Sequence, residues 1–237
     1  QLRSLLFNLV LLLSCFAQSV FSSVIVRSDI QPETPLAGQQ VILKVDVLSE
    51  KGWAKVSRFG DFEIPGTYVK LIDSQGVRLN ETLDGKEVTG QQYELFIYPQ
   101  TDGEINIPVI PLEVTIQTYG SDAGTSVTNT EIPSKSFTAR YPENMNSPEG
   151  FVSTSQLKVS QSWSPDFSDN DNTGKYQVGD AIKRSIYMEA ADIPGMAFSP
   201  LKFTSPDGVR IYQDESEVDD IVVRGSLTGK RAEHVTY

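Results

Sequence analysis

From residue 41 onward, apolar side chains in this chain recur at every second position. Apolar residues occupy every second position over 41–47 and 93–98, where the positions between them include Ile42, Phe96 and Tyr98, and apolar and polar residues alternate over 113–117 and 137–141. Because successive side chains of a strand point to opposite faces, this alternation predicts strands with one face on a core and the other in water. Almost no stretch has apolar residues at the three- and four-residue spacing of a helix. The pattern therefore predicts an all-β chain.

Turn-forming residues separate the predicted strands. They stand at Asp73-Ser74-Gln75-Gly76, Asp84-Gly85, Asp102-Gly103, Pro206-Asp207-Gly208 and Thr228-Gly229. Glycine and aspartate tolerate the left-handed backbone conformations that tight turns need. Short strands with turns at this spacing predict antiparallel β-sandwiches of the immunoglobulin-like kind.

The second half of the chain repeats the first. The matched segments, in the same order in both halves, are 38–47 with 179–188, 76–79 with 208–211, and 90–98 with 229–237. Each match alone is weak, because a glycine followed by alternating apolar residues begins many strands. Together the matches predict two related copies of one fold.

The repeat predicts two tandem immunoglobulin-like β-sandwich domains, one over 23–141 and one over 151–237. The linker between them is predicted at 142–150, where proline, asparagine and glycine interrupt the periodicity. The second copy reaches Tyr237, the counterpart of Tyr98, and the strands predicted after Tyr98 have no counterpart. We therefore expect a second sandwich that is incomplete at its C-terminus, in a chain that is a fragment of a longer protein.

The first 22 residues differ from the rest. Arg3 is their only charge, and a mostly apolar run over 5–13 is followed by small residues. This pattern predicts a secretory signal peptide at 1–22, since the run is shorter than the roughly 20 residues of a membrane span. Cys15 leaves two interpretations open: an acylated lipoprotein cysteine, or a residue of the discarded signal. Either way, we expect an exported protein without disulfides.

Charge and residue inventory argue against several function classes. The chain has 20 Lys and Arg against 31 Asp and Glu, and its net charge of −11 repels nucleic acid. His234 is the only histidine, and no Gly-x-Ser-x-Gly sequence accompanies it as in a hydrolase triad. Cys15 is the only cysteine, so the mature chain has no thiol nucleophile and no Cys-ligated zinc. We expect no catalytic residues and no cofactor.

One segment has the spacing of a calcium-binding loop. Asp169, Asp171 and Thr173 stand at loop positions 1, 3 and 5, with Gly174 at 6 and Asp180 at 12. Asp180 is shorter than the usual bidentate glutamate, and the flanking residues predict strands. The alternative is a solvated loop whose Gly-Asp pair begins the next strand.

Three further features each have an ordinary and a functional interpretation. A run of acids predicts a solvated loop or a docking patch for a basic partner, and it comprises Asp214, Glu215, Glu217, Asp219 and Asp220. Trp53 and Trp163 are interpreted either as residues of core or inter-sheet packing or as binding platforms for sugars and peptides. Residues 225–231 resemble a phosphate-binding loop but have three residues between the glycines where four are needed, so we interpret them as a hairpin turn.

Residues 93–108 resemble the signature of BatD-like oxygen-tolerance proteins, in which an aromatic-rich strand ends in a proline and a Gly turn leads to an Ile-Pro strand. Residues 176–182, 208–214 and 229–233 resemble the second domain of that family, in the same order. The resemblance implies a bacterial, exported protein with immunoglobulin-like domains in the periplasm. It also implies anchoring to the inner membrane by a C-terminal helix, which this chain does not include.

The family resemblance further implies von Willebrand A-type membrane proteins as partners and a role in aerobic or envelope stress tolerance. We therefore predict a non-enzymatic periplasmic scaffold that binds proteins through loops or exposed strand edges. The alternative is a cell-surface adhesin or a carbohydrate-binding array of sandwich modules, stabilised by calcium if the loop at 169–180 binds it.

Overall fold

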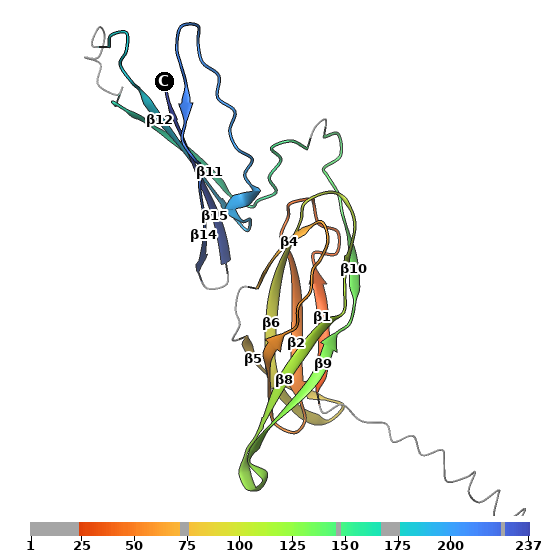
Figure 1. Ribbon diagram of the computed structural model, residues 1–237. Coiled ribbons are helices and arrows are strands. Elements are labelled where there is room, and N and C mark those ends of the chain that lie inside the picture. Colours follow the sequence, from red (N-terminus) through yellow and green to blue (C-terminus); the bar gives the residue numbers. More distant parts are fainter. Residues whose placement is uncertain (1–23, 72–75, 146–147, 167–175, 224–225) are drawn as a thin grey trace, which may run out of the picture.

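The computed structural model describes residues 24–71, 76–145, 148–166, 176–223 and 226–237. It is 59% strand and 3% helix. All pairs of neighbouring strands are antiparallel, and the sheets form two groups (Figure 1). The structure thus confirms an all-β chain of antiparallel sheets, whereas the immunoglobulin-like assignment and the domain boundaries stay predictions. The predicted signal peptide at 1–22, with Cys15, lies outside the described residues.

The first group of sheets, which we call the first unit, runs from residue 25 to residue 139. Its five-stranded sheet has the order β1 (Ile25–Gln31), β2 (Val41–Ser49), β6 (Lys86–Pro99) and β4 (Thr67–Leu71), with β5 (Val77–Leu83) also paired to β6. A three-stranded sheet has the order β3 (Trp53–Phe59), β8 (Ile110–Thr118) and β9 (Gly124–Ile132). A two-stranded sheet pairs β7 (Gly103–Ile107) with β10 (Lys135–Ala139). A 3-10 turn, η1 (Gly120–Asp122), precedes β9.

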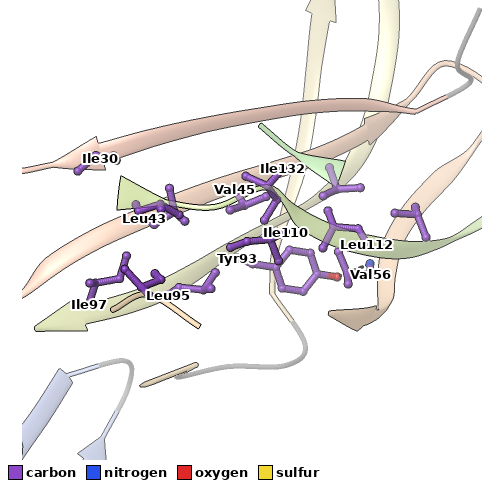
Figure 2. Packing of buried hydrophobic residues seen from close by; sticks show 14 of the residues in the cluster. Ile30, Leu43, Val45, Val56, Tyr93, Leu95, Ile97, Ile110, Leu112 and Ile132 are labelled. Atoms are coloured by element: carbon purple, nitrogen blue, oxygen red, sulfur yellow. Dashed lines mark hydrogen bonds between the residues drawn. The ribbon is translucent and has the colours of Figure 1, made fainter. Parts of the chain in front are cut away.

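The core of the first unit lies between these sheets. The predicted alternation holds in β2, where Val41, Leu43, Val45 and Val47 are all fully buried. Figure 2 shows how their neighbours from β6 and β8 pack against them, among them Tyr93, Leu95, Ile97, Ile110 and Leu112. The backbone N–H of Val56 donates a hydrogen bond of 2.8 Å to the Tyr93 hydroxyl, so this buried ring also joins β6 to β3.

The second group, which we call the second unit, is one five-stranded sheet. Its order is β11 (Leu157–Ser164), β12 (Lys183–Ala191), β15 (Ser226–Thr236) and β13 (Tyr212–Gln213), with β14 (Glu217–Val223) also paired to β15. A segment that includes η2 (Gly195–Ala197) covers part of one face, where Ile193 and Phe198 pack on Met188 and Ala190. Among the described residues, no second sheet packs on this one.

The two five-stranded sheets have the same design. In each, one long strand pairs with two short strands along one side: β6 with β4 and β5, and β15 with β13 and β14. Strands β4 and β13 pair with the C-terminal part of the long strand, and β5 and β14 pair with its N-terminal part. The repeat in the sequence therefore corresponds to a repeated sheet.

Two details of the predicted repeat are wrong. Residues 76–79 lead into β5, whereas the matched residues 208–211 precede β13, the counterpart of β4. Their similarity is only that of a glycine before alternating apolar residues. In addition, Val41 pairs with Ile97 in the first unit. The sequence matches of these two residues are Ile182 and Thr236, but Thr236 pairs with Lys183, the residue after Ile182. The strand register that the sequence matches imply for β12 and β15 is therefore off by one residue from the observed register. An error of one residue moves side chains to the opposite face of the sheet.

The turn predicted at Thr228-Gly229 is also wrong, because both residues lie within β15. The pairing of β14 with β15 begins with Val223 opposite Ser226, before Thr228 and Gly229. Gly229 is needed for a different reason: a Cβ atom there would lie 2.3 Å from the backbone nitrogen of Gly195. The glycine therefore permits the close approach of η2 to the sheet.

Another correction concerns the face of β2 and β6 that was expected to lie in water. Three apolar side chains lie on this outer face, opposite to the core: Ile42 of β2 and Phe96 and Tyr98 of β6. Phe96 and Tyr98 are nonetheless buried, with 2% and 1% of their surface exposed. A contact with the second unit covers them, so β6 is buried on both faces at this end.

Candidate functional site

The contact between the two units has an apolar centre. Leu227, at the beginning of β15, is completely buried and packs with Phe96 and Tyr98 of β6. Tyr68 of β4 lies beside them, with its ring 5.9 Å from that of Tyr98. Because the side chains come from both units, their burial requires both units to be in place.

Charged and polar groups surround this centre. The Lys70 ammonium donates a hydrogen bond of 2.8 Å to the Asp220 carboxylate of β14, and both side chains are only partly exposed. The other oxygen of Asp220 accepts a hydrogen bond of 2.7 Å from the backbone N–H of Gly195. Asp220 thus connects β4 of the first unit to both β14 and η2 of the second. Burial raises the pKa of Tyr98, so its hydroxyl stays protonated and accepts a hydrogen bond from Gln40.

A cleft lies beside this contact and is lined by both units. Tyr98, Tyr141, Phe151 and Ala197 contribute to its walls, and the Tyr141 and Phe151 rings meet edge to face at 6.0 Å. Its volume of about 190 Å³ is below the roughly 300–1,000 Å³ of sites that enclose drug-sized ligands. We therefore interpret this region as a joint between the units.

The segment at 229–233, which contributes to the family resemblance, forms a buried polar network. The Arg231 guanidinium donates a hydrogen bond of 2.6 Å to the Glu233 carboxylate, two positions along the same face of β15. The other carboxylate oxygen accepts hydrogen bonds from Ser216 and Gln213. Burial alone raises the pKa of Glu233. These hydrogen bonds and the charge of Arg231 together lower the pKa by more, so it lies below its usual value.

His234 lies near a serine and a carboxylate, as a hydrolase histidine would. Its Nδ1 is 2.8 Å from the Ser185 hydroxyl, and its Nε2 is 3.7 Å from the exposed carboxylate of Glu217. The backbone of Ser185, however, belongs to β12, which pairs with a strand on each side. The backbone N–H groups of β12 therefore take part in the pairing with β11 and β15.

The acidic run at 214–220 is a solvated loop only in its first part, where Asp214 and Glu215 are exposed and precede β14. From Glu217 onward it belongs to β14, which pairs with β15. Asp214 forms an ion pair of 2.9 Å with Lys183, and Asp220 forms the one with Lys70 already described. Tertiary pairing with basic residues thus accounts for part of this charge, while Glu217 and Asp219 remain exposed on β14.

Three members of the predicted calcium loop, Asp169, Asp171 and Thr173, lie outside the described residues. Asp180 is described, and its carboxylate accepts a hydrogen bond of 2.7 Å from the backbone N–H of Gln177 within a turn. Gly179 and Asp180 lie just before β12, which begins at Lys183, as Gly38 and Gln39 lie just before β2. Among the described residues, no three His, Cys, Asp or Glu side chains gather closely enough to hold a metal ion.

Both tryptophans are half-buried, and each is stacked with an arginine. Arg78 of β5 lies 4.6 Å from the centre of the Trp53 ring, and this contact joins the two larger sheets of the first unit. Arg184 of β12 lies 5.3 Å from the centre of the Trp163 ring, within a single sheet. Trp53 therefore takes part in the predicted inter-sheet packing, whereas Trp163 packs along one sheet.

Exposed apolar side chains gather on the two outer strands of the second unit. On β11, Leu157 and Val159 are 51% and 58% exposed, and on β14, Val218 and Val222 are 46% and 41% exposed. Sequence periodicity could not identify these surfaces, because it does not show which strands end up at the edges of a sheet.

No family model matches the chain, and no curated protein matches it. The part of the chain that the structure describes has no helix of the length and hydrophobicity needed to cross a membrane.

The ion pair between the units provides a first prediction. In a double-mutant cycle of Lys70→Met and Asp220→Asn, we expect a coupling energy of about 1 kcal/mol in the free energy of unfolding, because the pair is largely shielded from water. Urea titrations of the four proteins measure this energy. The matched control is Lys86 with Glu50, an ion pair of 2.9 Å that is far more exposed, where we expect a coupling of about 0.3 kcal/mol. Equal coupling in the two pairs would contradict the account.

The buried carboxylate provides a second prediction. Because folding lowers the pKa of Glu233, its ionised form stabilises the fold above the carboxyl pKa of the unfolded chain, about 4.3, and this stabilisation is lost as the pH falls through the folded pKa. We expect Glu233→Gln to lower the free energy of unfolding at pH 7 and to flatten its decline between about pH 5 and 3. Ser216→Ala removes one donor and should flatten the decline in part. Denaturant titrations across this range test both, and an unchanged slope in Glu233→Gln would refute the assignment.

Proposed function

We propose that the protein is a non-enzymatic scaffold that binds other proteins through the outer strand β14 of its second unit. The observation that carries this proposal is the row of exposed apolar side chains on β14, formed by Val218, Ile221, Val222 and Val223. Exposed apolar residues at a sheet edge are typical of protein-binding surfaces, because an incoming strand can pair with the edge and bury them.

The charge of β14 indicates the chemistry of the partner. Glu217 and Asp219 are exposed between the apolar residues, and the chain as a whole has a net charge of −11. A partner surface with basic and apolar residues would complement this strand, and the opposite net charges would accelerate association. The contact between the units supports the same role, because it holds β14 in a fixed position relative to the first unit.

The resemblance to BatD-like proteins supports a specific setting for this scaffold. We propose export to the bacterial periplasm, anchoring at the inner membrane, and von Willebrand A-type membrane proteins as partners. The biological role would then be tolerance of oxygen or of envelope stress.

Affinity capture from solubilised bacterial membranes tests this proposal. With the purified protein as bait, we expect to recover a von Willebrand A-type protein. The bait variant Val218→Ser/Val222→Ser should recover about tenfold less, which corresponds to about 1.4 kcal/mol of binding free energy for two interface side chains.

The matched control bait is Val77→Ser/Val127→Ser, which removes two even more exposed valines from the first unit and should capture normally. Recovery of no von Willebrand A-type protein by the unchanged bait, or equal recovery by all three baits, would contradict the proposal.

A further inference from the structure

The opposite edge of the second unit, β11, presents an unusually open strand. Among the described residues, β11 pairs only with β12, and its other side has no partner strand. Of its eight residues, only Trp163 is even partly buried. Leu157 and Val159 are among the exposed ones and lie on the same face as Trp163.

Two other outer strands of this molecule, β14 and β1, are less suited than β11 to pairing with a copy of themselves. Natural sheets protect their edges with charged side chains, with proline, or by covering them. Strand β14 carries three acids, Glu217, Asp219 and Asp220, and β1 carries Arg27 and Asp29 and lies against β9. Strand β11 contains no proline, and Lys158 is its only charged residue.

We propose that β11 pairs with β11 of a second copy of this chain, antiparallel across a two-fold axis. The two copies would then form one continuous sheet, and a two-fold interface of this kind closes without leaving a further edge of the same type. This interaction uses the edge opposite to β14, so it does not depend on the partner proposed above.

The sequence of β11 is complementary to itself in this arrangement. Residues opposite each other must lie on the same face, so the axis passes through a residue, and Ser160 and Gln161 are the central ones. With the axis at Gln161, Val159 faces Trp163 of the other copy and Lys158 faces Ser164. With the axis at Ser160, Leu157 faces Trp163 and Lys158 faces Ser162. Both registers pair an aliphatic side chain with an aromatic one and avoid opposing lysines.

Contacts within the second unit order side chains of β11 before any pairing. The Arg184 guanidinium donates hydrogen bonds of 3.0 and 2.8 Å to the side-chain oxygen of Gln161 and lies over the Trp163 ring. The Trp163 ring also lies 6.1 Å from that of Tyr237. Side chains that are already ordered lose less conformational entropy on association.

The expected affinity is modest. One pair of eight-residue strands buries less surface than a standard interface, so we expect a dissociation constant on the order of 10 μM. Each copy has a net charge of −11, so the copies repel each other at low salt. Because salt screens this repulsion, dimerisation should strengthen from about 20 to 300 mM NaCl.

Sedimentation equilibrium of the purified protein tests the proposal. We expect a concentration-dependent mixture of monomer and dimer. The variant Ser160→Lys/Ser162→Lys should weaken dimerisation at least about tenfold, because it places lysine opposite lysine in both registers and changes only exposed serines. The matched control Ser126→Lys/Asn129→Lys adds the same charge to exposed positions of β9 and should dimerise at least as well as the unchanged protein.

Charge reversal provides a second, independent measurement. Mixing the lysine variant with Ser160→Glu/Ser162→Glu should restore dimers, which would be mixed, because lysine then faces glutamate across the axis. Unchanged circular dichroism spectra would show that both variants are folded. A monomer at all concentrations up to about 1 mM, or equal dimerisation of the β11 and β9 lysine variants, would overturn the proposal.

Discussion

The burial of Leu227 against Phe96 and Tyr98 is the contact on which the arrangement of this molecule depends. It makes β6 a strand that is buried on both faces at one end, by the core of the first unit and by the second unit. The ion pair of Lys70 with Asp220 forms beside it and also fixes η2 through Gly195. With the start of β15 held in this way, the two outer strands of the second sheet project in fixed directions.

The sequence was most informative where a single sheet face determines burial. Val41, Leu43, Val45 and Val47 alternate because one side of β2 faces the core, and their period predicts that strand correctly. Gly229 was mistaken for a turn because its role is to let η2 approach the sheet, a contact between segments distant in sequence. Phe96 and Tyr98 were assigned to water because periodicity cannot show that a second unit covers the outer face, although two aromatic residues there were a signal.

The candidate interaction surfaces were predicted only in kind. Exposed strand edges were expected, but the choice of β11 and β14 depends on strand order, which is set by pairing across the sheet and not by local sequence. The acidic run at 214–220 shows the same limit, since its partners Lys183 and Lys70 are remote in the sequence. The sequence has no triad motif around His234, and its contact with Ser185 could be seen only once β12 and β15 were paired.

Small-angle X-ray scattering from dilute protein tests most directly whether Leu227 couples the two units. The account predicts that the unchanged protein scatters as one rigid particle. Leu227→Lys would place a charge beneath Phe96 and Tyr98, separate the units, and give a larger radius of gyration with a broader distribution of interatomic distances. Identical scattering from the two proteins, or scattering typical of flexibly linked units from the unchanged protein, would contradict the account.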